Sequence, residues 1–563
     1  MDDVVVKDAT GGADPSARSG LWLAGGAIIG AVITLGLVVL GATMLGSEPA
    51  EAMSPPLFIE ESQSAGITHR YDGEFNFFVG GGVAVFDCND DGKPDLFLAG
   101  GSNPAALYRN SSPIGGSLRF EALSGTSTDL TGVAGAYPID IDSDGLVDLA
   151  VLRVGENVLL RGTGDCGFER GNEAWGIDGG NDWTAAFSAT WEGSATMPTL
   201  AFGNYLTLDE TAREANLCAD HALLRPAGAI GYAAPTALAP GWCTLSILYS
   251  DWDRSGGADL RMTNDRHYYL DGEDQLWRFV EGEAPRPYRR EEGWQPMRIW
   301  GMGIASHDLT GDGYPEVFLS SQGDNKLQTL VDGPQAPTYT DVALQAGATA
   351  TRPSAGVLPS TAWHAEFQDV NNDGFIDLFV AKGNVEAMPE YATDDPNNLL
   401  LGTPDGTFVE SADAAGIANV ARARGAALAD FNLDGMLDLV EVNRRENIKL
   451  WRNLGWGDPV EPAPMGNWMA VQLSQPSPNR NAIGAWIEVK AGDRTMEREV
   501  TIGGGHAGGQ LGWIHFGLGA ADAAELRVRW PDGETAPWQS IDANRFVIIE
   551  RGASEPLLWS PPD

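Results

Sequence analysis

The feature that most constrains the fold of this chain is an acidic nine-residue loop that recurs along it. In the first copy, DCNDDGKPD (87–95), acidic or amide side chains stand at positions 1, 3, 5 and 9, and a glycine stands at position 6. Five further copies keep the arrangement with few substitutions. We number them by their place in the chain as loop 1 (87–95), loop 2 (140–148), loop 4 (251–259), loop 5 (308–316), loop 6 (369–377) and loop 7 (430–438). Because like charges at this spacing repel, their crowding predicts a bound cation.

The long gap between loops 2 and 4 contains a degenerate copy. The stretch 185–205 has the same apolar flanks, but its loop, Trp191 to Thr199 (loop 3), keeps only Glu192 of the acids. With loop 3 included, consecutive loops begin 51 to 61 residues apart. A repeat of this length, with short apolar runs and glycine turns, is typical of a four-stranded propeller blade.

The sequence therefore predicts an all-β fold, a seven-bladed β-propeller over residues 57–465 followed by a small β-domain over 466–551 and a tail over 552–563. A strand-like segment, LFIEESQSAGI (57–67), precedes loop 1. We expect this N-terminal strand to complete the last blade of the ring. In the C-terminal part, WIEVKAGDRTMEREVTI (486–502) alternates around a Gly-Asp turn, as a hairpin does.

The chemistry of the loops favours calcium. Calcium takes six to eight oxygen ligands in flexible geometry, whereas magnesium keeps more water and fewer protein ligands. Side chains at positions 1, 3, 5 and 9 and the backbone carbonyl at position 7 supply such oxygens, and glycine at position 6 permits the turn. We expect up to six Ca²⁺ sites with a mainly structural role.

The predicted side-chain ligands are Asp87, Asn89, Asp91 and Asp95 in loop 1; Asp140, Asp142, Asp144 and Asp148 in loop 2; Asp251, Asp253, Ser255 and Asp259 in loop 4; Asp308, Thr310, Asp312 and Glu316 in loop 5; Asp369, Asn371, Asp373 and Asp377 in loop 6; and Asp430, Asn432, Asp434 and Asp438 in loop 7. The predicted backbone ligands are Lys93, Leu146, Gly257, Tyr314, Phe375 and Met436.

Two other interpretations of the loops are weaker. An EF-hand requires glutamate at position 12 and flanking helices, whereas five of the six loops have an apolar residue there, within strand-like runs. A solvated turn explains one Asp- and Gly-rich loop, but it does not explain six copies in register with a strand pattern.

The net charge of −42, from 78 acidic and 36 basic residues, disfavours nucleic-acid binding, because phosphates require surplus Lys and Arg. Disorder does not follow from this charge, since 43% of the residues are hydrophobic.

The N-terminal region predicts a membrane anchor. Residues 21–46 carry no charge over 26 residues, more than the ~20 that cross a bilayer as a helix. Lys7 and Arg18 precede this span, and every charged residue that follows it as far as Glu61 is acidic. The positive-inside rule then places a tail (1–20) in the cytoplasm, and it places a linker (47–56) and the propeller on the periplasmic or extracellular side. A cleaved signal peptide is the alternative, although its apolar region is shorter.

The four cysteines allow at most two disulfides if the chain is exported. Cys218 and Cys243 bracket an insertion, and we expect them to pair. The pairing of Cys88 and Cys166 stays open.

A few other motifs could carry chemistry. The glycine run GGGHAGG (503–509) lacks the GK[ST] of a phosphate loop, which favours a closely packed or flexible β-loop. Trp300, Trp363, His364 and Arg424 lie near strand starts, where they could face a ligand on the propeller axis, although packing between blades is the commoner role. Asp265, Arg266 and His267 could likewise line a site, but a structural polar cluster is favoured.

These motifs resemble known families. The acidic loops in a seven-fold array are similar to the FG-GAP/VCBS repeats of integrin α-subunit propellers. The pieces NRNAIGAWIEV (479–489), REVTIGGGHAGGQ (498–510), IHFGLG (514–519) and LRVRWPDGE (526–534) resemble the ASPIC/UnbV domain. The combination resembles a bacterial-type relative of the cartilage acidic protein family. The resemblance implies calcium ligands in each intact loop and none in loop 3; Ser255 and Glu316 depart from the usual pattern.

The expected function is binding: adhesion to, or scaffolding of, a protein or glycan by an anchored calcium propeller. No convergent catalytic set is evident, so we do not expect an enzyme. The alternative is a lyase-like enzyme that acts on polysaccharide on the same calcium-stabilised scaffold.

Overall fold

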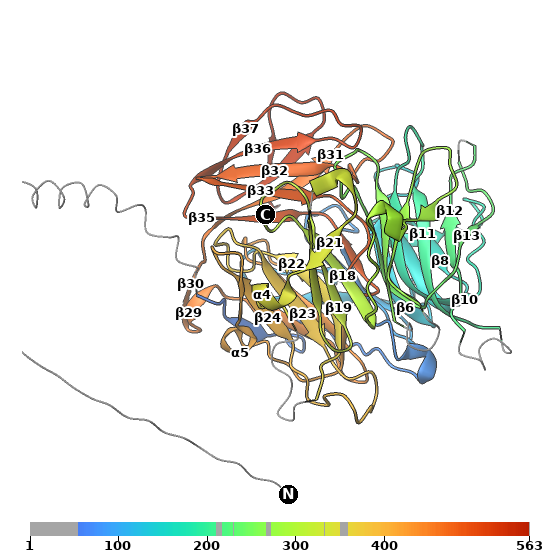
Figure 1. The fold of residues 1–563 in the computed structure, drawn as a ribbon. Helices are drawn as coiled ribbons and strands as arrows, with labels where there is room; N and C mark the ends of the chain where they lie inside the picture. The colour runs from blue at the N-terminus through green and yellow to red at the C-terminus, as the bar shows by residue number, and fades with distance from the viewer. Residues whose placement is uncertain are drawn as a thin grey trace, which may run out of the picture. The chain divides into compact units, whose positions relative to one another are not determined.

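The computed structural model describes residues 54–125, 127–209, 217–228, 230–265, 272–331, 333–349 and 358–561 (Figure 1). The predicted cytoplasmic tail and transmembrane helix, and most of the predicted linker, lie outside these residues. Among the helices of the described residues, none combines the length and apolar character needed to cross a membrane.

The described residues from Phe58 to Asn453 form antiparallel sheets built from four-strand units, which we call sheets 1 to 7 by the loop that each contains. The units of loops 2 and 3 are joined into one eight-stranded sheet, and the unit of loop 1 takes a fifth strand from the C-terminal part. Sheet 1 holds β2 (Val83–Phe86), β3 (Asp95–Leu98), β4 (Ala106–Asn110) and β5 (Phe120–Leu123); sheet 2 holds β6 (Val133–Ile139), β7 (Asp148–Gly155), β8 (Val158–Gly164) and β9 (Gly167–Arg170); sheet 3 holds β10 (Asp182–Thr190), β11 (Thr199–Thr207), β12 (His221–Leu224) and β13 (Thr236–Leu238).

Sheet 4 holds β14 (Thr244–Ser250), β15 (Asp259–Asn264), β16 (Gln275–Arg278) and β17 (Arg286–Pro287); sheet 5 holds β18 (Gly301–His307), β19 (Glu316–Ser321), β20 (Lys326–Leu330) and β21 (Tyr339–Asp341); sheet 6 holds β22 (Ala362–Gln368), β23 (Asp377–Lys382), β24 (Asn398–Gly402) and β25 (Phe408–Glu410); sheet 7 holds β26 (Ala423–Ala429), β27 (Asp438–Asn443), β28 (Lys449–Asn453) and β1 (Phe58–Glu60). A short pairing of β10 with β7 also joins sheets 2 and 3.

The sheets follow one another in a propeller-like ring. The first strand of each sheet contacts the first strand of the next, and β26 of sheet 7 contacts β2 of sheet 1. The N-terminal strand β1 pairs with β28 through Phe58 and Asn453. The all-β class and the completion of the last sheet by the N-terminal strand are both confirmed.

Short helical turns follow the outer strands. The turns α4 (Ala343–Ala346) and α5 (Ala412–Ala415) come after β21 and β25, and each ends at a glycine with positive φ, Gly347 or Gly416. Gly347 lies in the segment YTDVALQAGA (339–348), and Gly416 lies in the similar segment FVESADAAGI (408–417). The 3-10 turns are η1 (Phe75–Phe77), η2 (Arg290–Glu292) and η3 (Gly333–Gln335).

The acidic loops have the same register in every sheet, because each joins the first strand to the second. The acid at position 9 opens the second strand and pairs with the residue just before position 1, as in Phe86–Asp95 and Gln368–Asp377. The degenerate loop 3 keeps this register through the pair Thr190–Thr199. All seven loops therefore lie at corresponding ends of their sheets.

The C-terminal part forms two further four-stranded sheets (Figure 1). Buried residues of these sheets share one hydrophobic core with residues of sheets 2 and 3. One sheet holds β31 (Asn467–Ser474), β35 (Ile514–Gly519), β38 (Arg545–Glu550) and β39 (Leu557–Trp559); the other holds β32 (Trp486–Ala491), β33 (Arg494–Glu499), β36 (Ala523–Arg529) and β37 (Gln539–Asp542). The hairpin β29 (Trp456–Asp458) and β30 (Glu461–Ala463) precedes them. Strand β39 lies in the segment that the sequence analysis treats as a tail.

One segment of the C-terminal part, Ile502 to Gly509, runs among the first strands of the ring, and we call it the axial segment. Gly504 N donates to Ile247 O (2.7 Å), Gly505 N donates to Ile304 O (2.7 Å), and Ala507 O accepts from Ala136 N (3.1 Å). The next strand, β34 (Gly509–Leu511), pairs in parallel with β2. His506 and Ala507 are fully buried. The axial segment therefore fills the space where an open channel would expose the first strands.

Candidate metal sites

Each intact loop is folded around the carboxylate at position 1. In loop 6, Asp369 Oδ1 accepts from Asp373 N (3.2 Å) and Oδ2 accepts from Gly374 N (2.7 Å). Asp87, Asp140, Asp308 and Asp430 accept the corresponding glycine N–H in their own loops, and so does Asp251. The glycines at position 6 have φ between +80° and +93°, a left-handed conformation that favours glycine. This arrangement turns the position 1 carboxylate inward.

The acid at position 9 ties the loop to the third strand of the sheet. In loop 1, Asp95 Oδ2 accepts from Cys88 N (2.8 Å) and Oδ1 accepts from Asn110 N in β4 (2.7 Å). Loops 2, 6 and 7 repeat both contacts. In loop 5, Glu316 accepts from Leu309 N, Thr310 N and the Thr329 hydroxyl, so the longer acid serves the same place.

Positions 3 and 5 face each other across the loop. The amide of Asn432 donates to Asp434 (3.0 Å), and the equivalent bonds occur in loops 1 and 6. The remaining oxygens at position 3 are informative: Asn89 Oδ1, Asp142 Oδ1 and Asn432 Oδ1 are buried and accept no hydrogen bond from the described residues. Asn432 is fully buried. A buried acceptor without a donor costs free energy, so a cation fits these positions.

The position 7 residues contribute through the backbone. The N–H groups of Lys93, Leu146, Tyr314, Phe375 and Met436 donate to the position 5 carboxylate of their own loop. Loop 4 differs in two ways. Asp259 accepts from the Trp252 indole, the Tyr288 hydroxyl and Phe279 N, so two of its three donors are side chains. Ser255 at position 5 replaces a carboxylate with a hydroxyl.

Burial makes the loops electrostatically costly without a counter-ion. Desolvation raises the pKa of Asp95 and Asp148 to about 8. In loops 6 and 7, desolvation and the neighbouring carboxylates raise the pKa of Asp369, Asp377, Asp430 and Asp438 well above the ordinary value. In loop 2, carboxylate oxygens of Asp140, Asp142 and Asp148 lie within 4.8 Å of one another. Several carboxylates held this close in a buried site are the donor set that a divalent cation requires.

Comparison with known families agrees with this organisation. Residues 87–151 and 369–441 match the FG-GAP-like repeat family, and residues 475–556 match the ASPIC and UnbV family. The chain carries FG-GAP-like repeats and an ASPIC/UnbV domain. The matched repeats contain loops 1, 2, 6 and 7, and the matched domain coincides with most of the C-terminal sheets. The resemblance inferred from the motifs is therefore confirmed.

Two relatives are cartilage acidic protein 1 of Xenopus tropicalis, 28% identical over 192 residues, and that of Mus musculus, 26% identical over 196 residues. The matches cover 33% of this chain and 28% and 27% of those proteins, so the chain aligns with less than a third of their length. Among solved structures, the match to BBS1N in complex with ARL6DN covers 74% of this chain and 100% of the matched chain, at 11% identity and a TM-score of 0.40. An Agrocybe aegerita lectin that recognises non-reducing terminal N-acetylglucosamine covers 64% and 88%, at 13% identity and a TM-score of 0.36.

The one acid of loop 3, Glu192, is paired with a cationic side chain from elsewhere in the chain. Arg225, from the segment after β12, donates from Nε and Nη2 to the two oxygens of Glu192, both at 2.8 Å. Thr199, at position 9, donates its hydroxyl to the same carboxylate (2.6 Å). The loss of a metal site inferred from sequence fits this geometry, but the arginine that replaces the cation lies 33 residues away and had no local signal.

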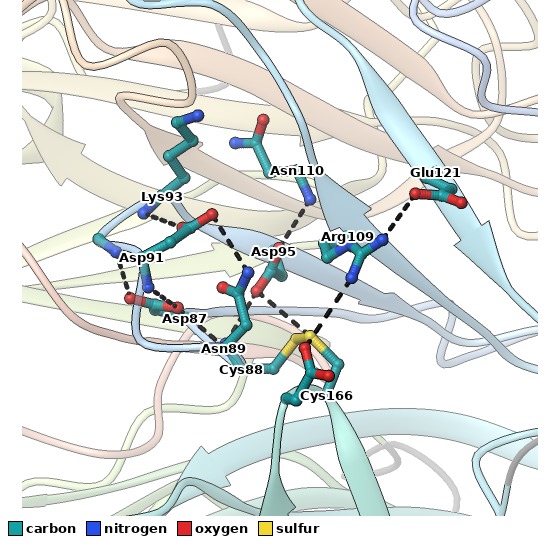
Figure 2. Close-up of a disulfide and its surroundings, with 12 residues drawn as sticks. Asp87, Cys88, Asn89, Asp91, Lys93, Asp95, Arg109, Asn110, Glu121 and Cys166 are labelled. Atoms are coloured by element: carbon teal, nitrogen blue, oxygen red, sulfur yellow. Dashed lines mark hydrogen bonds and ion pairs between the residues drawn. A yellow bond between two sulfur atoms is a disulfide. The ribbon is translucent and has the colours of Figure 1, made fainter. Parts of the chain in front are cut away.

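Both pairs of cysteines form disulfides. The predicted Cys218–Cys243 bond is present, and Cys88, at position 2 of loop 1, is bonded to Cys166 (Figure 2). The second bond joins loop 1 of sheet 1 to the turn between β8 and β9 of sheet 2. Asp95 lies beside this disulfide, but the sulfurs are bonded to each other and cannot serve as thiolate ligands.

The residues proposed for an axial ligand have other partners. Arg424 is fully buried and donates to Phe78 O (2.9 Å) and Val385 O (2.6 Å). His364 Nδ1 accepts from His506 N of the axial segment (3.2 Å), and Trp363 is fully buried with its indole bonded to Gly383 O. These contacts give Trp363 and Arg424 packing roles within the protein, and the half-buried Trp300 packs edge-on against Tyr391. The small residues of GGGHAGG and of the first strands were the available signal, because they allow backbones to approach closely. Asp265 accepts a hydrogen bond from the Tyr205 hydroxyl (2.6 Å), while Arg266 and His267 lie outside the described residues.

Proposed function

We propose that this protein is an exported, membrane-anchored calcium-binding β-propeller of seven blades that acts as an adhesion or scaffolding module for a protein or glycan. The observation that carries the calcium proposal is the set of buried position 3 oxygens, above all Asn432 Oδ1, that lack a donor inside carboxylate loops. Calcium would be held by the side chains at positions 1, 3, 5 and 9 and the carbonyl at position 7 of loops 1, 2, 4, 5, 6 and 7. Its role would be to neutralise the loops and hold the first two strands of each blade together.

A binding role is favoured over catalysis. A cavity of about 180 Å³ between sheets 5 and 6 and the ASPIC/UnbV domain is lined by His364, Glu366 and Arg498, among others. Both oxygens of Glu366 already accept hydrogen bonds, from Gln368 and Gln510 and from Leu428 N. These contacts give the Glu366 carboxylate a structural role in the cavity lining. The volume is below the ~300–1,000 Å³ of sites for drug-sized ligands, which favours a broad surface for a macromolecule.

The calcium proposal is tested by titration and by thermal unfolding of the exported part of the chain. Binding of a ligand to the folded state alone raises the unfolding temperature. We expect a large rise with Ca²⁺, little with Mg²⁺, and reversal by excess chelator. Asp434→Asn should lower the calorimetric stoichiometry by one, while the matched change Glu192→Gln in loop 3 should leave it unchanged. An unfolding temperature that is the same in Ca²⁺ and in chelator would contradict the proposal.

The ligand and the location need separate tests. A pull-down and a glycan array, each run in Ca²⁺ and in chelator, should give calcium-dependent capture without product formation; released glycan fragments would favour the enzyme alternative. Protease added to cells whose outer layers have been opened, with the cytoplasmic membrane left intact, should digest an epitope placed after residue 561 if the propeller is exported, and should spare it if the propeller is cytoplasmic.

A further inference from the structure

The ASPIC/UnbV domain touches the acidic loops directly. At loop 2, Asn479 N of the domain donates a hydrogen bond to Ser143 Oγ (3.0 Å). At loop 4, Asp251 N donates to the Glu499 carboxylate of the domain (2.7 Å). Within the described residues, loop 5 makes no hydrogen bond to this domain; its external partner is Arg254 of sheet 4, which donates to Gly313 O. Loops 2 and 4 are thus hydrogen-bonded to the C-terminal domain, whereas loop 5 is not, among the described residues.

His515 makes the most extensive of these contacts. Its Nε2 lies 2.6 Å from Oδ1 of Asn372, the position 4 residue of loop 6, and both side chains are buried. Asn372 passes the contact on, because its Nδ2 donates to Gly435 O of loop 7 (2.9 Å). Arg494 Nη2 also donates to the carbonyl of Asp373 (2.7 Å). One hydrogen-bonded chain therefore runs from the C-terminal domain through loop 6 to loop 7.

Trp513 makes the equivalent contact with loop 1. Its indole Nε1 donates to Gly92 O (3.0 Å), and Gly92 is the position 6 glycine on which the turn depends. At loop 7, Trp468 covers Gly435 so closely that a Cβ at that glycine would stand 1.9 Å from the indole ring. The domain therefore contacts the turn that places the position 1 and position 5 acids.

We propose that the ASPIC/UnbV domain is the outer shell of the metal loops, with His515 and Trp513 as positioning residues that hold loops 6 and 7 and loop 1 in ligand geometry. The inference rests on the proposed calcium function. Removing a group that hydrogen-bonds to a metal ligand and orients it commonly lowers metal affinity 10–100-fold. Binding free energies are reciprocal, so calcium in these loops strengthens docking of the domain by the same factor.

The test measures calcium-dependent protection of each loop separately. Hydrogen exchange of the exported part of the chain, followed by mass spectrometry across a Ca²⁺ titration, reports peptides from loops 1, 5, 6 and 7 in one experiment. The variants are His515→Ala, His515→Gln, which keeps an N–H donor, and Trp513→Phe, which keeps a ring but lacks the donor. Loop 5 is the internal control.

We expect His515→Ala to raise about tenfold the Ca²⁺ concentration that half-protects loops 6 and 7, and His515→Gln to restore most of the loss. Trp513→Phe should shift loop 1 in the same direction and spare loops 6 and 7. Loop 5 should be unchanged in all three variants. If His515→Ala does not fold, the paired behaviour of His515→Gln and Trp513→Phe on different loops still decides the question.

The outcomes separate this inference from the proposed function. If wild-type protein shows no calcium-dependent protection in any loop, the calcium function fails and the inference fails with it. If wild-type loops are protected and the variants need the same Ca²⁺ concentration, the calcium function stands and the outer-shell role is wrong. An equal shift of every loop, including loop 5, would indicate general destabilisation and would also overturn the positioning role.

Discussion

Arg225 supplies loop 3 with the positive charge that we propose a metal ion supplies in the other loops. Its two-pronged contact with Glu192 neutralises the one acid left in loop 3. Arg225→Met would leave the Glu192 carboxylate without its cationic partner, at a site where the Glu192 side chain is 18% exposed. Since hydrogen bonds to charged groups contribute about 1.5–3 kcal/mol, we expect a loss of about 2 kcal/mol in the free energy of unfolding, measured by urea denaturation.

The control for Arg225 is calcium itself. Because loop 3 holds an arginine instead of a metal, the loss should be equal in Ca²⁺ and in chelator. The double variant Arg225→Met, Glu192→Gln should recover part of it, since the stranded charge is gone. A loss that appears only in Ca²⁺ would mean that Arg225 supports a metal site.

His221 gives a prediction for acid stability. It is buried, accepts from Asn204 N and lies 3.0 Å from the Thr244 hydroxyl, and Asp220 is the charged group that acts on it. Desolvation lowers its pKa to about 4, below the unfolded value of about 6.5. The unfolded state therefore takes up a proton that the folded state refuses, and stability falls as pH drops from 6.5 to 4.

Replacing His221 should flatten that loss. His221→Gln has no group that titrates in this range, so its free energy of unfolding should fall less steeply between pH 6.5 and 4, by at most about 3 kcal/mol in total. The comparison is of slopes in urea denaturation series, because the substitution also changes stability at neutral pH. Equal slopes for the two proteins would show that His221 takes up its proton over the same pH range in the folded and unfolded states, which would contradict the lowered pKa.

At the scale of elements, the acidic loop was predictable because its information is local. Positions 1 and 9 act through backbone groups at most a few residues away or one strand further on, as Asp95 does with Cys88 and Asn110. The strands on either side carry continuous apolar runs, and the period repeats. Partners of these elements could not be inferred, since the Cys88–Cys166 bond depends on sheets 1 and 2 lying side by side.

The two disulfides should stabilise their elements to different degrees. By the chain-entropy argument, closing the 78-residue span from Cys88 to Cys166 contributes about 4 kcal/mol, and closing the 25-residue span from Cys218 to Cys243 contributes about 3 kcal/mol. We expect Cys88→Ser, Cys166→Ser to lower the free energy of unfolding more than Cys218→Ser, Cys243→Ser, as measured in urea under oxidising conditions. The reverse order would show that native contacts, and not loop closure, set these values.

At the scale of the whole molecule, the sequence predicted a propeller and a C-terminal β-domain, but it did not indicate how one packs against the other. The alternation in 486–502 indicates a hairpin, and β32 and β33 form it. Nothing local in GGGHAGG indicates that its partners are strands some 200 to 420 residues earlier, such as the backbone of Ile304 and of Ala84. The same separation hid His515, whose partner Asn372 is 143 residues away.

The final prediction concerns the axial segment, which connects the ASPIC/UnbV domain to the first strands of the ring. At Gly135 of β6, a Cβ would stand 1.9 Å from the carbonyl oxygen of Ala507, and that oxygen belongs to backbone that is hydrogen-bonded on the axis. Gly135→Ala should therefore force the axial segment away from the first strands, at about 1–3 kcal/mol, the usual range for overpacking. Gly257→Ala is the matched control, since no atom lies within 4 Å of its Cβ position and its φ is not left-handed. Urea denaturation should show the loss only in Gly135→Ala, and hydrogen exchange should show weaker protection of 502–509 in that variant. If Gly135→Ala matches Gly257→Ala in both measurements, the axial segment can accommodate a methyl group beside it. The ASPIC/UnbV domain would then be attached to the ring by its contacts with the acidic loops and not by this segment.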